Sequence, residues 1–405
     1  SLTLDGKDHQ SCQFLSKRAP DESHEFTWKE VTTTRGGELA EILGDQLRSV
    51  DSLVVKGNVN DKDFHAMWDA SLYGYLSVIN LKNAVLENNA VPDTAFFHEN
   101  EQYEGSSHEI FYYIGLRKII LPEGLEKIGE GAFYQASALR QVNFPSTLRY
   151  IGDFAFNATK LEMNQLVIPE GVEEINQYAF AFCRKLKAQV TLPSTIKKIG
   201  EWAFYGCPIT SINLPEGLES LGSLAFWDCD LREVSIPSSC HEFNEGWQFG
   251  FNRNLEKMHL PEGMTEIPDH FAVDCFRLRE VNFPHTLKHI GEKAFSLCIS
   301  LKNVDLPLGM QSLGEEAFSE LEALEQIVFP ASMKSLGKNS CSYWKNIKRI
   351  YCAAMEPPVC DPTDGGVFSG FDFPDGLNTP VVYVPKGSIN KYKDTSRNCM
   401  GWEKF

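Results

Sequence analysis

Residues 192–207 read Leu-Pro-Ser-Thr-Ile-Lys-Lys-Ile-Gly-Glu-Trp-Ala-Phe-Tyr-Gly-Cys. The same landmarks return in the same order along the chain: an apolar residue and Pro, a two-residue turn, Ile-Gly, and then Ala-Phe. We call the last Phe position the Phe slot, and it recurs every 22–24 residues at Phe133, Phe156, Phe180, Phe204, Phe226, Phe249, Ala272, Phe295, Phe318 and Cys341. A fixed period of about 20–50 residues is typical of a solenoid, in which each repeat forms one coil of a stack.

Each repeat predicts the same local structure, as the residues around 139–156 illustrate. Leu139, Val142 and Phe144 have L-x-x-L-x-L spacing, so a short strand would point them inward and the residues between them outward. Pro145 then ends the strand, and a second apolar group leads to the next Phe slot. We therefore predict an α/β-type repeat solenoid of the leucine-rich repeat class, curved and right-handed, with a short parallel β-sheet, turns and short helical segments.

The pattern divides the chain into four predicted parts. Residues 1–27 form a loosely ordered leader, and residues 28–113 form an N-terminal cap with atypical coils and an insertion at 90–113. Regular repeats of about 23 residues occupy 114–352, and residues 353–405 form a C-terminal cap. A cap is needed because a terminal coil would otherwise expose the core.

Within the caps, apolar spacing predicts individual elements. We expect helices over 37–43 and 61–68 and strands over 53–57 and 76–81. Near the C-terminus we expect a turn-rich loop from 361 to 380, a strand over 381–385 and a helix from 389. Phe96 and Phe97 are assigned to the insertion, which we expect on the binding face.

Composition excludes several functional classes. The formal net charge is −17 at pH 7, whereas nucleic acids and anionic membranes require a dense Lys/Arg stripe. We therefore expect no nucleic-acid partner. Because no run of about 18 apolar residues occurs, we expect no transmembrane segment. The sequence begins at Ser1 without a Met or a charged-then-apolar signal segment, so any export signal is expected to lie outside the given sequence.

Most of the 11 cysteines follow the repeat. Cys183, Cys207, Cys229, Cys275 and Cys298 each lie three residues after a Phe slot, which predicts a column of reduced, buried thiols. Cys352, Cys360 and Cys399 cluster near the C-terminus, where one disulfide bridge remains an alternative.

The combined motif LP-x-x-(I/L)-x-x-IG-x-x-AF-x-x-C-x-x-L closely resembles the BspA-type leucine-rich repeat family. Residues 192–209 and 283–301 carry nearly the whole motif, and 381–388 resemble the C-terminal ends of family members. The resemblance extends over residues 50–405, and 53–81 are similar to members from Bacteroides-like bacteria. It implies an exported surface protein or lipoprotein; some members bind host extracellular proteins as adhesins. It implies no catalytic residues.

Some repeats depart from the motif, and we expect those coils to be irregular. Ala272 occupies a Phe slot with Phe271 before it, and the Ile-Gly pair is replaced by Phe243-Asn244 and by Ile267-Pro268.

The sequence shows no pattern for catalysis, a cofactor or a metal. Hydrolase, phosphate-loop and C-x-x-C patterns are absent, and His285 and His289 bracket a turn where a metal pair would need a helix. Asp361, Asp364 and Asp372 match no calcium loop. Three tryptophans near Phe slots could form a sugar platform, although packing is the favoured interpretation: Trp202, Trp227 and Trp247.

The outward strand positions are the better binding candidates, because concave solenoid faces suit extended protein contacts. The candidates are Gln141, Asn143, Gln189, Asn213, Glu233, Lys257, His259, Glu280, Asn282, Asn303, Asp305, Arg349 and Tyr351.

We therefore predict a non-catalytic, cell-surface or secreted protein-binding module, without metal or cofactor. Its expected partner is an extracellular protein, with host matrix and plasma proteins as candidates. It would be exported and either secreted or held at the surface as an outer-membrane lipoprotein. The alternative is a glycan-binding surface protein.

Overall fold

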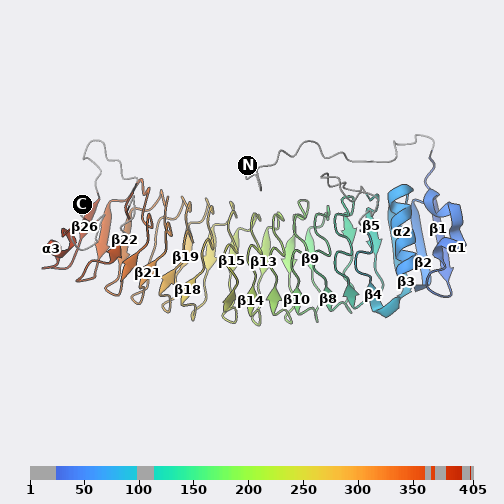
Figure 1. Cartoon of the computed structure of the whole chain (residues 1–405), viewed down its shortest axis with the longest axis horizontal. Coiled ribbons are helices and arrows are strands. Elements are labelled where there is room, and N and C mark those ends of the chain that lie inside the picture. Colours follow the sequence, from blue (N-terminus) through green and yellow to red (C-terminus); the bar gives the residue numbers. More distant parts are fainter. Residues whose placement is uncertain (1–23, 98–113, 361–365, 370–379, 395–401, 403–405) are drawn as a thin grey trace, which may run out of the picture. The chain divides into compact units, whose positions relative to one another are not determined.

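The computed structural model describes residues 24–97, 114–360, 366–369, 380–394 and 402 (Figure 1). It contains two compact units. The first comprises Ser1–Met163, Pro169–Val172 and Ala179–Leu186; the second comprises Asn164–Ile168, Glu173–Tyr178 and Lys187–Phe405. Each unit is a stack of coils joined by parallel strand pairing, so the predicted leucine-rich repeat solenoid is confirmed.

In the first unit, one sheet contains the L-x-x-L-x-L strands and the strands of the cap. Its order is β1-β2-β3-β5-β7, and all neighbours are parallel. The bounds are β1 Trp28–Thr33, β2 Ser52–Val59, β3 Val78–Leu86, β5 Lys118–Ile120 and β7 Gln141–Val142.

The cap of the first unit contains several helical segments. They are α1 Leu39–Leu43, the 3₁₀ segments η2 Gly44–Ser49 and η3 Glu87–Asn89, and α2 Asp61–Tyr73. The carboxylate of Asp63 in α2 links this helix to the start of α1, since it accepts hydrogen bonds from the backbone N–H groups of Gly37 (2.7 Å), Leu39 (2.9 Å) and Asn60 (3.0 Å). Both predicted cap helices are thus confirmed, and α2 continues five residues past the predicted end at 68 to Tyr73.

In the second unit, the equivalent strands form three separate parallel sheets. The first contains β9 Gln165–Val167, β11 Gln189–Thr191 and β13 Ser211–Asn213. The second contains β15 Glu233–Ser235, β17 Lys257–His259 and β19 Glu280–Asn282. The third contains β22 Gln326–Phe329, β24 Arg349–Cys352 and β26 Val381–Tyr383.

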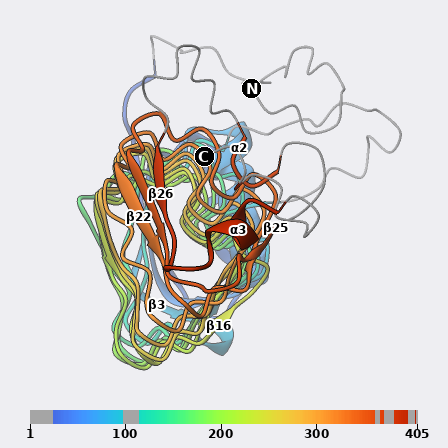
Figure 2. The same cartoon turned by 90° about the vertical axis from the view of Figure 1, so that its left-hand side faces the viewer.

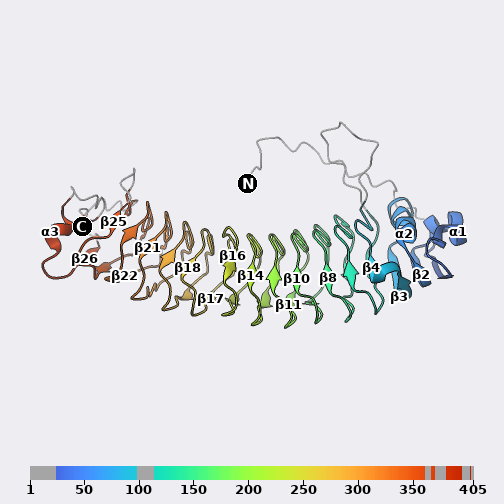
Figure 3. The ribbon, with the colours of Figure 1, turned by 60° about the horizontal axis from the view of Figure 1, so that its bottom comes forward.

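The coils also contribute two-residue strands at the corner where the repeat motif places its Ile-Gly pair, which the sequence did not predict as strands. We call this position the Ile-Gly corner, although some coils carry other residues there. In the first unit these are β4 Ala90–Val91, β6 Lys127–Ile128 and β8 Tyr150–Ile151. In the second unit they are β10 Glu174–Ile175, β12 Lys198–Ile199, β14 Ser220–Leu221, β16 Glu242–Phe243, β18 Glu266–Ile267, β20 His289–Ile290, β21 Ser312–Leu313, β23 Ser335–Leu336 and β25 Val359–Cys360. Figure 3 shows β10, β14 and β16 following one another along this corner. Within the described residues 114–360, the coils contain these strands and turns and no helix.

Phenylalanine rings form the core of each unit. In the first unit Phe133 and Phe156 stack with centroids 5.2 Å apart and planes 10° apart, and in the second Phe204 and Phe226 stack at 5.6 Å and 7°. Burying a large apolar side chain is worth about 1.5–3 kcal/mol. Repetition of one flat ring per coil therefore builds a continuous core.

Phe96 begins the column in the first unit, which corrects its assignment to the insertion. Its ring stacks on Phe133 at 5.3 Å, and Phe64 of α2 meets it edge-on at 6.1 Å. The dipeptide Ala95-Phe96 matches the Ala-Phe landmark of the repeat. It was not recognised as a Phe slot because the insertion places the next Phe slot 37 residues later, outside the regular period.

The expected irregular coils interrupt the corner strands. Gly200 donates its N–H to the carbonyl of Ile175 (2.7 Å), and Gly222 donates to Ile199 (2.8 Å). Pro268 occupies this position in its own coil and has no N–H to donate. β16 and β18 accordingly do not pair with each other: β16 pairs only with β14, and the corner strands resume as β18-β20-β21-β23-β25.

The C-terminal end is closed by aromatic packing. Figure 2 shows β22 and β26 on one flank of the last coils and β25 on the other. Trp402 packs against Phe368 (4.9 Å) and Tyr392 (5.4 Å). The helix predicted from 389 is α3, Ile389–Tyr392; residues 395–401 and 403–405 lie outside the described residues.

The Ile-Gly corner generates a stability prediction for the second unit. A Cβ at Gly222 would lie 2.4 Å from the backbone N of Glu201, whereas a Cβ at Gly309 would meet nothing closer than 3.9 Å. We expect Gly222→Ala to lower the free energy of unfolding by about 1–3 kcal/mol through overpacking. Gly309→Ala should leave it unchanged or raise it by about 0.4–1 kcal/mol. Urea unfolding followed by circular dichroism measures both; equal effects would contradict the close approach of the coils.

Candidate binding surface

The predicted binding residues occupy outward positions of the strands, with three exceptions. Asn143 follows the end of β7, while Asn303 and Asp305 lie exposed between β19 and β22 without forming a strand. The remaining ten stand on β7, β11, β13, β15, β17, β19 and β24: Gln141, Gln189, Asn213, Glu233, Lys257, His259, Glu280, Asn282, Arg349 and Tyr351. Parallel register aligns these residues in rows across each sheet.

Charges in the middle sheet of the second unit pair with one another. Lys257 Nζ lies 3.2 Å from Glu280 Oε2, and His259 Nε2 lies 3.3 Å from Glu233 Oε1. Exposed pairs of this kind contribute about 0–1 kcal/mol. A partner docking here would first have to disrupt these pairs.

Two predicted binding asparagines have a structural role. The side-chain oxygen of Asn282 accepts from Leu260 N–H (2.9 Å), and its amide donates to Leu260 C=O (3.0 Å). Asn143 makes the same two bonds with Leu121, at 2.8 and 3.0 Å. Each amide thus supplies the pairing that a backbone neighbour would otherwise provide.

Three of the other candidate side chains are unengaged. Within the described part of the chain, Gln189, Asn213 and Arg349 are exposed and make no side-chain hydrogen bond or ion pair. Tyr351 stacks on Tyr383 with centroids 4.7 Å apart and planes 14° apart. Tyr383 was missed as a candidate because the sequence placed its strand in the C-terminal cap and not in register with β24.

A hollow of about 760 Å³ opens over the strands of the first unit. Lys82, Lys118, Gln141 and Glu162 are among its polar lining groups, and Ile120 is among the apolar ones. Glu162 is already paired with Arg140. The hollow includes predicted residues Gln141 and Asn143, but the amide of Asn143 is committed to Leu121.

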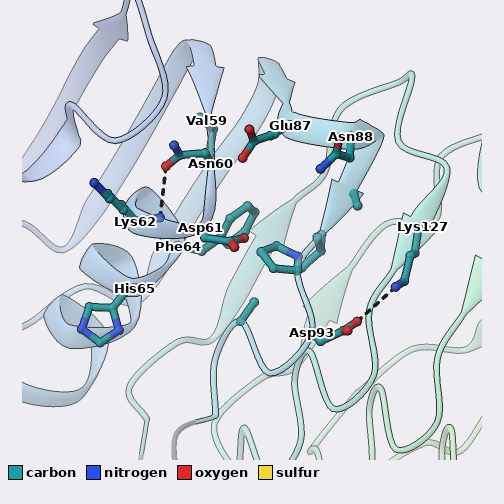
Figure 4. A pocket seen from close by; sticks show the side chains of 14 residues that line it. Val59, Asn60, Asp61, Lys62, Phe64, His65, Glu87, Asn88, Asp93 and Lys127 are labelled. Atoms are coloured by element: carbon teal, nitrogen blue, oxygen red, sulfur yellow. Dashed lines mark hydrogen bonds and ion pairs between the residues drawn. The ribbon is translucent and has the colours of Figure 1, made fainter.

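A second hollow, of about 650 Å³, lies between the start of α2 and β4 (Figure 4). Its walls carry mixed charge, including Asp61, Lys62 and Glu87, together with an ion pair between Asp93 and Lys127 at 3.2 Å. Asn60 faces this hollow but caps α2 by accepting from the backbone N–H of Lys62 at 3.1 Å. This mixture selects no single class of ligand.

The thiols are structural. The predicted column is buried and reduced, as are Cys352 and Cys360, so a bridge between these two is absent; Cys399 lies outside the described residues. Cys229 donates to the Phe204 carbonyl at 3.3 Å. Burial raises the pKa of Cys240 to about 12 and also raises the pKa of Cys275. Because the thiolate is the reactive form, these residues are poor nucleophiles.

Other aromatic rings pack against the three tryptophans. Trp227 is buried against Trp247 at 5.1 Å, and Trp247 stacks on His270 at 3.6 Å and 7°. Trp202 stacks on Tyr178 at 5.2 Å. Burial lowers the pKa of His270, so its ring favours the neutral form. These contacts occupy ring faces that a sugar would need.

Histidines and acids do not assemble a metal site in the part of the chain that the structure describes. His285 Nδ1 lies 3.1 Å from Glu262, and His289 Nδ1 lies 2.6 Å from Ser312 Oγ. The three aspartates weighed for calcium, Asp361, Asp364 and Asp372, lie outside the described residues.

Comparison with known proteins places this architecture in a family. The BspA type leucine-rich repeat region matches in six copies, over residues 106–189, 188–295 and 270–355. The chain belongs to this family. The match confirms the resemblance carried by the repeat motif. A search of curated proteins finds no match.

Solved structures of similar fold come from several bacteria. A leucine-rich repeat protein from Bacteroides ovatus has a TM-score of 0.53 and 23% identity, covering 75% of this chain and 79% of its own. A leucine-rich cell surface protein from Faecalibacterium prausnitzii has a TM-score of 0.37 and 21% identity, covering 65% and 83%. The pneumococcal vaccine antigen PcpA has a TM-score of 0.37 and 18% identity, covering 86% and 77%.

Among the described residues, the helices of this family member are too short and too polar to cross a bilayer.

The asparagine geometry predicts different effects of two outward substitutions. Asn282→Ala removes both bonds to the buried Leu260 backbone, so we expect the free energy of unfolding to fall by about 1–2 kcal/mol. Gln189→Ala should change it by less than about 0.5 kcal/mol. Urea denaturation compares them, and a neutral Asn282→Ala would contradict the structural role.

Proposed function

We propose that this protein is a non-catalytic binding module that holds a protein partner against the outward residues of its strands. The proposal rests mainly on one observation: several exposed strand side chains make no hydrogen bond or ion pair among the described residues, including Gln189, Asn213 and Arg349. Side chains that point inward are committed to the core, and the thiols are buried. Binding capacity is therefore concentrated on the strand face.

Family membership supports a protein as the partner. Leucine-rich repeats present extended surfaces built from one strand per coil, which suit contact with an extended area of another protein. The overall charge of −17 disfavours nucleic acid as the ligand.

We place the protein outside the cytoplasm, either secreted or held at the cell surface by a lipoprotein anchor. This proposal rests on the family to which the chain belongs. Host matrix and plasma proteins are then the first partners to test, as in an adhesin.

Solid-phase binding to immobilised fibronectin and fibrinogen tests this function. We expect saturable binding to at least one of them, weakened about tenfold or more when Gln189→Arg and Asn213→Arg place bulky cations on the strand face. The matched control changes net charge equally on the corner strands, through Glu242→Gln and Glu266→Gln, and should bind as the parent does.

Absence of saturable binding to both proteins would remove the host-matrix version of the proposal. Equal loss in the control would instead indicate a general charge effect. A glycan array tests the remaining alternative: hits that Trp247→Ala abolishes would favour a glycan ligand over a protein.

A further inference from the structure

The third sheet of the second unit carries a distinctive outward surface. Register places Gln326, Arg349 and Val381 in one row and Val328, Tyr351 and Tyr383 in the next. We call these six residues the C-terminal sheet patch. Figure 2 shows β22 and β26, which carry four of them, on the same flank.

The patch exposes large apolar side chains. Val328 is 49% exposed, Val381 53% and Tyr383 45%. On the other two sheets of this unit, Val167 is the sole large apolar side chain exposed among the described outward positions. Exposed apolar side chains gathered on one face commonly mark interaction sites.

The two tyrosines are already ordered. Their rings stack with centroids 4.7 Å apart and planes 14° apart across β24 and β26. Binding to such a surface costs less side-chain entropy than binding to mobile groups, and tyrosine and arginine are enriched among residues that dominate binding energy.

The charge of the patch indicates which charged group on a partner it would bind. Arg349 is exposed and is the single charged residue among the six, in a chain whose net charge is −17. Within the described residues its guanidinium makes no ion pair; the pKa of Glu325 is lowered mainly by its hydrogen bond with Lys348 and to a smaller extent by the charge of Arg349. In the middle sheet, by contrast, Lys257 and Glu280 neutralise each other at 3.2 Å. A carboxylate on a partner could therefore pair with Arg349 without displacing an existing contact.

From this combination we propose that the C-terminal sheet patch anchors an extended segment of a partner protein. The segment carries aliphatic or aromatic side chains that pack on Tyr351, Tyr383 and Val328, and an acidic residue that pairs with Arg349. The inference rests on the proposed protein-binding function and assigns its strongest contact.

Selection of displayed random dodecapeptides on the immobilised full chain tests the inference. We expect enriched peptides to combine apolar residues with Asp or Glu. In fluorescence anisotropy, the best peptide should bind about tenfold or more weakly when Tyr351→Ser and Tyr383→Ser are combined, and severalfold more weakly to Arg349→Gln. The control, Gln189→Ser with Asn213→Ser on the first sheet, should bind as the parent does, and a scrambled peptide should not bind. Circular dichroism verifies that each variant is folded.

The outcomes separate this inference from the proposed function. Peptides that bind all patch variants unchanged would overturn the patch as anchor while leaving protein binding intact. No enriched peptide would also overturn the inference, whereas the fibronectin and fibrinogen assay decides the function independently. A chain that dimerises in sedimentation, and becomes monomeric when Tyr351→Ser and Tyr383→Ser are combined, would assign the patch to a second copy instead.

Discussion

The spacing between successive coils is the constraint on which the rest of each unit depends. Parallel pairing holds neighbouring strands about 4.8 Å apart, and flat stacked rings fit that rise, as Phe204 and Phe226 do at 5.6 Å. The corner leaves no room for a Cβ at Gly222 because the backbone of the preceding coil is 2.4 Å from where it would lie. Pro268 cannot make the corresponding hydrogen bond, and the corner strands are interrupted there.

The same constraint determines what remains for function. Inward side chains fill the core, and turn residues bond to adjacent coils, so outward strand residues are the ones free to vary. They are not equivalent, however. Asn282 supports the backbone of Leu260, and Lys257 pairs with Glu280, whereas Arg349 and Tyr351 belong to a surface with exposed apolar groups. Binding is therefore expected to be unevenly distributed along the strands.

The sequence predicted the structural features that recur from one repeat to the next. The strands and the buried thiol column followed from the period, because each position has the same neighbours one coil away. Phe96 was missed since an insertion separates it from the next Phe slot. The two hydrogen bonds between the Asn282 side chain and the Leu260 backbone, and the stacking of Tyr351 on Tyr383, depend on side-chain conformation and on register between distant segments. A single sequence specifies neither of these.

The central claim is that inward residues determine the fold while unengaged outward residues are dispensable for it. Free energies of unfolding in urea for two variants test this directly. Replacing Gln141, Gln189, Asn213, Asn303 and Arg349 together by Ser should cost less than about 1 kcal/mol, because these side chains are exposed and unbonded among the described residues. Phe226→Ala alone should cost about 3–5 kcal/mol. A fivefold variant as unstable as Phe226→Ala would contradict the account.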